Sequence, residues 1–228
     1  MNPNSSGTTS PCYCTPRKSS TCLYGLVLAA TASPVDVAAD VRRIEDGCGV
    51  ACIGNKIPAA RSVFQLVPAT RQSQPNSRIS YGSVFFVQLV HASDALYLRS
   101  EPPLVDGRFA PRYHNPVRLN RLRDCYAKWR AVHWDRHQRF ETEGEPVSPC
   151  ERIVIQHVMT NQCLAVEHRD WHCSLLGFES GVSVHTYSDL YHNETSECIW
   201  NILAEPMDDD HHSAHCRIKS SSSSSSSS

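Results

Sequence analysis

The sequence of 228 residues has no block of charge of one sign, because its 22 Lys and Arg and 23 Asp and Glu give a formal net charge of -1. Nucleic acids and anionic membranes bind clustered basic residues, so neither is expected as a main partner. No apolar run approaches the roughly 20 residues that cross a bilayer as a helix. The composition therefore argues against nucleic-acid binding and against a membrane anchor.

Motifs that signal catalysis are also missing. The chain contains no Gly-x-Ser-x-Gly turn and no phosphate-binding glycine loop. His168-Arg169-Asp170 is similar to part of a kinase catalytic loop, but no glycine-rich loop and no Asp-Phe-Gly accompanies it. No acid, base and nucleophile converge, so we expect a protein that is not an enzyme and uses no cofactor and no small-molecule substrate.

The eleven cysteines show no paired framework. Their number is odd and their spacing is irregular, so we expect free thiols in a reducing, cytoplasmic setting. A zinc site at Cys48 and Cys52 would need two further ligands nearby. The segment from His211 to Cys216 carries residue types that bind metals, but nothing in its sequence would preorganise them, and no metal is expected there.

Two stretches of the chain look like one unit written twice. The first is Phe86–Leu98 and the second is Val154–Val166. Laid over each other, they share the residue pairs Gln88/Gln156, Val90/Val158 and Leu96/Leu164. Each stretch is followed at a similar distance by a strand that opens on tryptophan, at Trp129 and at Trp200. A repeat of this size indicates a repeat architecture.

Each repeat predicts four short β-strands. Val84–Val90 is a β-branched and aromatic run that is too short for a helix, and polar turn residues follow it. A period of 68 to 71 residues fits a lobe of a β-trefoil with enlarged loops. A trefoil has three lobes, and the third is only half visible. Val63–Val67 has the shape of the closing strand with Phe64 in the tryptophan place, but the strand pair that should open lobe one is missing.

We therefore predict one all-β domain, a β-trefoil over residues 21–207. Lobe one is partial and covers 21–70, lobe two covers 78–140, and lobe three covers 147–207. One short helix is expected from Ser33 and Pro34, which suit the N-cap and N1 positions, to Gly47. The polar leader 1–20 and the acidic, histidine and poly-Ser tail 208–228 are expected to be disordered.

The two repeated tryptophans are expected to fill the trefoil core with their indole N–H groups hydrogen bonded. A carbohydrate-stacking role would require Gln-x-Trp, which occurs at neither position. The predicted core residues are Phe64, Leu66, Val87, Leu96, Trp129, Ile155, Leu164, Val184, Trp200 and Ile202.

Lobe three carries a resemblance to a known family. The strand pair Val154–Arg169, followed by Val184-His185-Thr186-Tyr187 and by Trp200–Leu203, resembles the MIR-like β-trefoil of the cilia- and flagella-associated protein 161 family. Shorter segments around Cys48, Tyr81 and Trp129 align with that family in the same order. The similarity covers roughly residues 23–207, and it implies a MIR/ricin-like trefoil.

The resemblance implies a structural role. Members of the family are microtubule inner proteins, which bind the luminal wall of the A-tubule in axonemal doublet microtubules and stabilise the doublet. The implied partners are α/β-tubulin and other inner proteins, and the implied location is the cytoskeleton of the cilium or flagellum. Arginine and aromatic residues dominate interface energies, so we name candidate contacts in the long loops. These candidates are Arg108, Phe109, Arg112, Tyr113, Trp134, Arg136, Arg169 and Trp171.

A second interpretation stays open. Arg17-Lys18, the apolar stretch Leu23–Ala30 and the small residues Thr31–Ser33 together resemble a secretory signal. Cleavage near Ala32 would make the chain a secreted or luminal MIR-type module that binds carbohydrate or protein, and the sequon at Asn193 would then matter. The apolar run is short and a polar leader precedes it, which favours the cytoplasmic interpretation. The intact mass of the native protein separates the two.

Overall fold

The computed structural model describes residues 25–31, 44–54, 59–70, 79–92, 94–102, 104–105, 108–109, 114–148, 151–174, 176–204 and 216–220. The helix predicted from Ser33 to Gly47 falls mostly in residues 32–43, outside the described residues.

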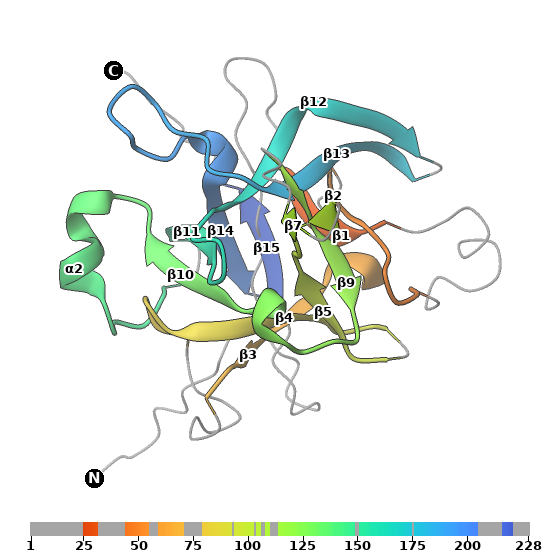
Figure 1. Cartoon of the computed structure of the whole chain (residues 1–228), viewed down its shortest axis with the longest axis horizontal. Coiled ribbons are helices and arrows are strands. Elements are labelled where there is room, and N and C mark those ends of the chain that lie inside the picture. Colours follow the sequence, from red (N-terminus) through yellow and green to blue (C-terminus); the bar gives the residue numbers. More distant parts are fainter. Residues whose placement is uncertain are drawn as a thin grey trace, which may run out of the picture.

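Strands dominate the described part of the chain (Figure 1). The strands are β1 (Val27–Ala30), β2 (Val50–Ile53), β3 (Phe64–Pro68), β4 (Val84–Leu89), β5 (Leu96–Arg99), β6 (Leu104–Val105), β7 (Arg108–Phe109), β8 (Asn115–Pro116), β9 (Arg118–Asn120), β10 (Trp129–His133), β11 (Arg152–His157), β12 (Leu164–Ser174), β13 (Gly177–Val184), β14 (Ile199–Ala204) and β15 (Cys216–Ser220). The helices are α2 (Arg139–Thr142) and the 3-10 turns η1 (Ala60–Ser62), η2 (Cys125–Ala127), η3 (Arg136–Gln138) and η4 (Ser196–Cys198).

Six antiparallel strands close a barrel. Strand β3 pairs with β4, β4 with β10, β10 with β11, β11 with β14, β14 with β15, and β15 returns to β3. Three hairpins, β1/β2, β5/β9 and β12/β13, each begin by pairing with a barrel strand. Lobe one is then β15, β1, β2 and β3, lobe two is β4, β5, β9 and β10, and lobe three is β11 to β14. The predicted all-β trefoil is confirmed.

The pairing register shows that the three lobes are equivalent. Each closing strand carries an aromatic residue at or next to its start: Phe64 is the first residue of β3, Trp129 is the first of β10, and Trp200 is the second of β14. On one side these residues pair with the opening strand of their own lobe, at Cys216, Phe85 and Ile153 respectively. On the other side they pair four positions further along the next opening strand, at Leu89, His157 and Ser220 respectively. Phe64 therefore occupies the place of the two tryptophans.

The strand that opens lobe one comes from the far end of the chain. The sequence does not predict this strand and favours a disordered tail over 208–228. Residues 216–220 instead form β15, which runs beside β14 over its full length and meets β3 and β1. Five residues without a β-branched alternation carry little strand propensity of their own. The neighbouring strand edges, which need backbone partners, impose the conformation.

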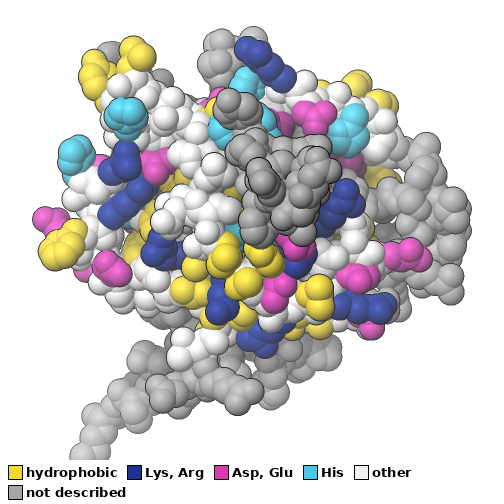
Figure 2. All heavy atoms as spheres, in the orientation of Figure 1, with side chains coloured by type: hydrophobic (Ala, Val, Ile, Leu, Met, Phe, Trp, Pro, Cys, Tyr) yellow, Lys and Arg dark blue, Asp and Glu magenta, His cyan; other side chains and the backbone are white. Residues whose placement is uncertain are grey.

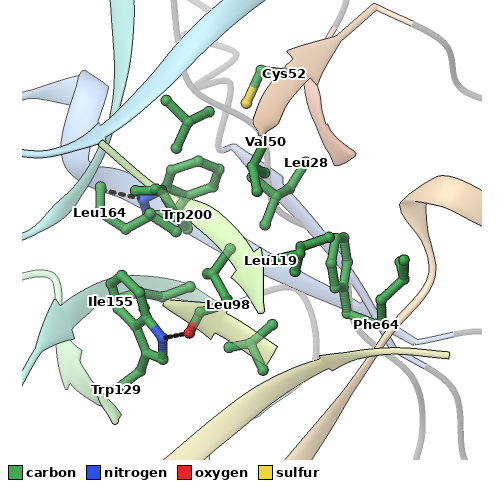
Figure 3. Close-up of a cluster of buried hydrophobic side chains, with 14 of the residues drawn as sticks. Leu28, Val50, Cys52, Phe64, Leu98, Leu119, Trp129, Ile155, Leu164 and Trp200 are labelled. Carbon is green, nitrogen blue, oxygen red and sulfur yellow. Dashed lines mark hydrogen bonds between the residues drawn. The ribbon is translucent and has the colours of Figure 1, made fainter. Parts of the chain in front are cut away.

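The two tryptophans confirm the expected hydrogen bonding. Both rings are fully buried, and the indole Nε1–H donates to the main-chain carbonyl of Leu98 at 2.8 Å in lobe two and of Leu164 at 2.7 Å in lobe three (Figure 3). Leu98 rather than Leu96 is therefore the structural equivalent of Leu164. The reason is that the turn between β4 and β5 is two residues longer than the turn between β11 and β12.

One hydrophobic core fills the body. Nine of the ten predicted core residues are buried, and Leu66 is partly buried against the same cluster. Side chains of all three lobes meet there, with Leu28 and Val50 from lobe one, Leu119 from lobe two and Ile155 from lobe three (Figure 3). The core thus holds the three lobes together as one unit.

A buried ion pair joins lobe one to lobe three. Arg61 Nη1 on η1 lies 2.8 Å from Glu179 Oε1 on β13, and the two side chains are only 6% and 3% exposed. Arg61 also donates to the carbonyl of Ala30 at 3.1 Å, and Ser174 Oγ donates to Glu179 at 3.0 Å. Each charge is therefore paired and hydrogen bonded, as burial requires.

Replacing Glu179 with alanine is expected to lower the free energy of unfolding by about 3 kcal/mol, because Arg61 is left as an uncompensated buried charge. The double variant Arg61→Met/Glu179→Leu removes both charges and should recover most of that loss. Urea unfolding followed by tryptophan fluorescence measures both variants. A single variant as stable as the wild type would contradict this account of the pair.

Candidate interaction surface

Four of the eight predicted partner contacts belong to the long connection between β5 and β9. Arg108 and Phe109 form β7, which pairs with β6 as a short separate hairpin. Arg112 and Tyr113 lie outside the described residues. For these four residues, contact with a partner stays a prediction.

Trp134 and Arg136 follow β10, in the connection to lobe three. Trp134 is 40% exposed, and the guanidinium carbon of Arg152 lies 5.4 Å from the centroid of its ring. This distance suits a cation–π contact. Arg136 donates to the main-chain carbonyl of His192, and its Nε lies 4.0 Å from the carboxylate of Glu194. Arg136 is thus already engaged within the chain, although about half of its side chain is exposed.

Arg169 and Trp171 lie on β12, in a stretch where the register with β13 shifts between Val166 and Trp171. The hairpin β12/β13 is much longer than the other two, and it extends from the body at the upper right of Figure 1. Arg169 is exposed, whereas Trp171 is partly buried and donates its indole N–H to the carbonyl of His168 at 3.1 Å.

The predicted contacts therefore do not form one surface. The structure divides the described ones among the hairpin β6/β7, the connection from β10 to α2, and the hairpin β12/β13. Figure 1 shows α2 on the opposite side of the view from the end of the β12/β13 hairpin.

Several exposed apolar residues are not predicted from the sequence, and three of them lie in two loops that Arg136 and Arg139 connect. Phe140 on α2 is 90% exposed, and Leu190 and Tyr191, in the loop between β13 and η4, are 96% and 83% exposed. One or two apolar residues between polar neighbours form no periodic pattern, so the sequence does not predict whether their side chains are buried or exposed. Arg136 donates a hydrogen bond to His192 in the loop between β13 and η4. This tertiary contact, which the sequence does not reveal, connects the loop that carries Phe140 with the loop that carries Leu190 and Tyr191.

Glu167 on β12 is the centre of a separate polar cluster. Its carboxylate accepts hydrogen bonds from Ser183, from Tyr187 at 2.7 Å and from His114 at 2.8 Å. The centroid of the His185 ring lies 4.5 Å from the ring centroids of both His114 and Tyr187. Burial opposes ionisation of Glu167, but the three hydrogen bonds outweigh it and lower the pKa of this carboxyl below its usual value.

Because folding lowers the pKa of Glu167, the charged form adds stability above the unfolded-state pKa. That stability is lost as the pH falls through the lowered folded-state pKa. We expect the urea midpoint to fall less steeply in Glu167→Gln than in the wild type between about pH 6 and pH 3. The variant Glu141→Gln, at an exposed carboxylate, is the control for the loss of one negative charge. If the urea midpoint changes equally with pH in Glu167→Gln and in the wild type, ionised Glu167 does not contribute to stability.

Three further features concern only the residues that the structure describes. Within them, no group of three or more His, Cys, Asp or Glu side chains is arranged to hold a metal ion. None of the helices in this part of the chain is long and apolar enough to cross a membrane. None of the six cysteines whose side chains are described there forms a disulfide, and Cys52, Cys163 and Cys198 are buried.

Sequence comparisons give one family. Residues 110–205 match the model of the cilia- and flagella-associated protein 161-like domain. Cilia- and flagella-associated protein 161 of Mus musculus is 28% identical over 163 residues, which cover 70% of this chain and 54% of the relative. The Bos taurus protein is 26% identical over 162 residues (70% and 50%), and the Danio rerio protein is 34% identical over 79 residues (34% and 26%). The chain thus spans about half the length of the mouse and cattle relatives.

Solved structures match the fold at low sequence identity. An SDF2-like protein from Arabidopsis thaliana matches with a TM-score of 0.51 at 14% identity, over 85% of this chain and 94% of that one. The protein O-mannosyltransferase Pmt1-Pmt2 complex of S. cerevisiae matches with a TM-score of 0.53 at 10% identity, over 95% of this chain and 29% of that one. These likenesses show a MIR-like β-trefoil and carry no functional statement.

The family match and the fold agree on the same part of the chain. The matched residues run from the connection before β8 to the end of β14, and so they contain the second half of lobe two and all of lobe three. The repeated tryptophans and the His185-Thr186-Tyr187 segment lie inside this range. Residues 110–205 are thus similar to the cilia- and flagella-associated protein 161-like domain, and the mouse and cattle proteins of that name match 70% of this chain.

Proposed function

We propose that this chain is a structural, non-enzymatic protein of cilia and flagella. In this proposal it is a microtubule inner protein that binds the luminal wall of the A-tubule in axonemal doublets and stabilises the doublet during bending. Its partners are α/β-tubulin and neighbouring inner proteins, and it acts without nucleic acid, membrane or small-molecule substrate. The observation that supports the proposal is the match to a domain model and to curated relatives that are named for association with cilia and flagella.

The architecture supports a role in adhesion. The barrel is closed, so each of its six strands has a partner on both sides. A closed barrel has no free strand edges and presents its loops from a rigid frame. The described surface mixes both signs of charge, with ion pairs such as Arg99–Asp124 at 3.0 Å and Arg121–Asp94 at 2.6 Å. Such a surface suits a polar protein partner better than it suits a polyanion.

The test uses the tagged full chain in ciliated cells. Detergent removes the membrane and matrix, and a salt wash then removes loosely bound axonemal proteins. We expect the chain to stay with the washed doublets, because a protein held inside the tubule is not displaced by salt at the outer surface. Recovery of the chain in the detergent-soluble fraction would contradict the proposed function.

A further inference from the structure

Two surface loops that are distant in sequence are joined by an ion pair and a hydrogen bond. The first is 134–142, with η3 and α2, and the second is 188–195, between β13 and η4. We call them together the paired-loop tip. Arg139 Nη2 lies 3.0 Å from the carboxylate of Glu194, whose side chain is only 5% exposed. Arg136 adds its hydrogen bond to the carbonyl of His192. The two arginines of the first loop thus hold the second loop in place.

The second loop is also ordered from within. The carboxylate of Asp189 accepts the backbone N–H of Tyr191 at 2.8 Å, the backbone N–H of Asn193 at 2.9 Å and the side-chain amide of Asn193 at 3.3 Å. His192 takes a left-handed φ of 63°, which is uncommon for a residue other than glycine. These contacts fix a tight reversal, and they hold Leu190 and Tyr191 next to its turning point.

The fixed loops expose large apolar side chains. Phe140 is 90% exposed beside Arg139, and Leu190 and Tyr191 are 96% and 83% exposed beside His192. Figure 2 shows hydrophobic atoms at the left edge, over α2, and at the upper left, over the second loop, with Lys or Arg atoms between them. Rigid aromatic and aliphatic anchors lose little entropy on binding, and they are typical of interface hot spots. The arrangement therefore favours a docking function.

The charge and size of the tip restrict its partner. The two loops contain four carboxylates and two arginines, and both arginines already contact the second loop. This excess of carboxylates repels anionic membranes and nucleic acids. The three exposed anchors offer at most about 600 Å², by the areas usual for such side chains. A stable complex needs about 800 Å² from each partner, so other surfaces of the trefoil must add contact area to the tip in any lasting complex.

We propose that the paired-loop tip is the anchor by which this chain docks onto a folded protein whose surface offers apolar sockets with a basic rim. The inference rests on the proposed function, since it names the surface that would hold the chain on the doublet. The remaining contact area comes from other surfaces of the same trefoil.

The experiment compares three tagged full-length chains in ciliated cells. They are the wild type, the tip variant Phe140→Ser/Leu190→Ser/Tyr191→Ser, and the control Leu122→Ser/Phe178→Ser. The control residues are 60% and 71% exposed and lie outside the tip, so the control variant removes exposed apolar side chains from elsewhere on the surface. We expect the wild type and the control to stay in the salt-washed axoneme. The amount of the tip variant retained there should be lower by about tenfold or more. Thermal unfolding of the purified chains checks the fold, and the single variant Tyr191→Ser replaces the triple variant if that one does not fold.

The outcomes separate the two proposals. If the wild type and the tip variant are retained equally, the inference is overturned and the proposed function stands. If the wild type is absent from the axoneme, the proposed function is overturned, and the inference that rests on it falls as well. Flotation with phosphatidylserine vesicles by the wild type, but not by the tip variant, would show a membrane anchor and would also overturn the inference.

Discussion

Replacing Ile218 with proline is expected to open the barrel and to lower the free energy of unfolding by about 3 kcal/mol or more. Ile218 is the central residue of β15, and it pairs with Ile202 on β14. Proline cannot donate a backbone hydrogen bond, and its ring does not fit inside a strand that has neighbours on both sides. Strand β15 joins β14 to β3, so its loss would leave two barrel strands with unpaired edges.

The matched control is Ile218→Val, which keeps the backbone N–H and the β-branched shape and should stay within about 1 kcal/mol of the wild type. Urea unfolding monitored by circular dichroism gives the free energy for both variants. A proline variant as stable as the wild type would mean that residues 216–220 do not close the barrel. Lobe one would then need its opening strand from another source.

The variants Trp129→Ala and Trp200→Ala are each expected to lower the free energy of unfolding by about 4 kcal/mol. Each substitution empties the space of a fully buried ring and leaves a buried carbonyl, of Leu98 or Leu164, without its indole donor. The two positions are equivalent in register, so the two losses should be similar. Phenylalanine at either position keeps most of the apolar volume, and it should cost less than alanine does.

Trp134→Ala is the control for the tryptophan series. Its ring is 40% exposed and its removal should cost about 1 kcal/mol or less. The free energies come from urea unfolding followed by circular dichroism, which does not depend on the tryptophan that was removed. If one of the two core tryptophans proves no more important than Trp134, the threefold equivalence of the lobes is contradicted.

The repeat made most of the fold predictable from sequence. Buried strands carry β-branched and aromatic runs, and the tryptophan at the start of β10 and β14 marks the same structural place twice. Phe64 could be assigned to the third such place because its strand has the same pattern. The core residues followed from this alignment, since the barrel is filled by residues at fixed register positions.

Other features could not be predicted because they depend on tertiary contacts. Strand β15 has no apolar pattern of its own, and the edges of β14 and β3 determine its conformation. The shift from Leu96 to Leu98 depends on the length of one turn, which an ungapped alignment does not show. The paired-loop tip exists only because Glu194 meets two arginines from a loop about 55 residues earlier in the chain.

The most direct test of the account is electron cryo-tomography of ciliary doublets, with subtomogram averages from cells that contain this chain compared with averages from cells that lack it. The account predicts a compact density of trefoil size on the inner wall of the A-tubule that disappears when the chain is removed. Identical A-tubule lumens in the two averages, with the chain present in the cilium, would contradict it.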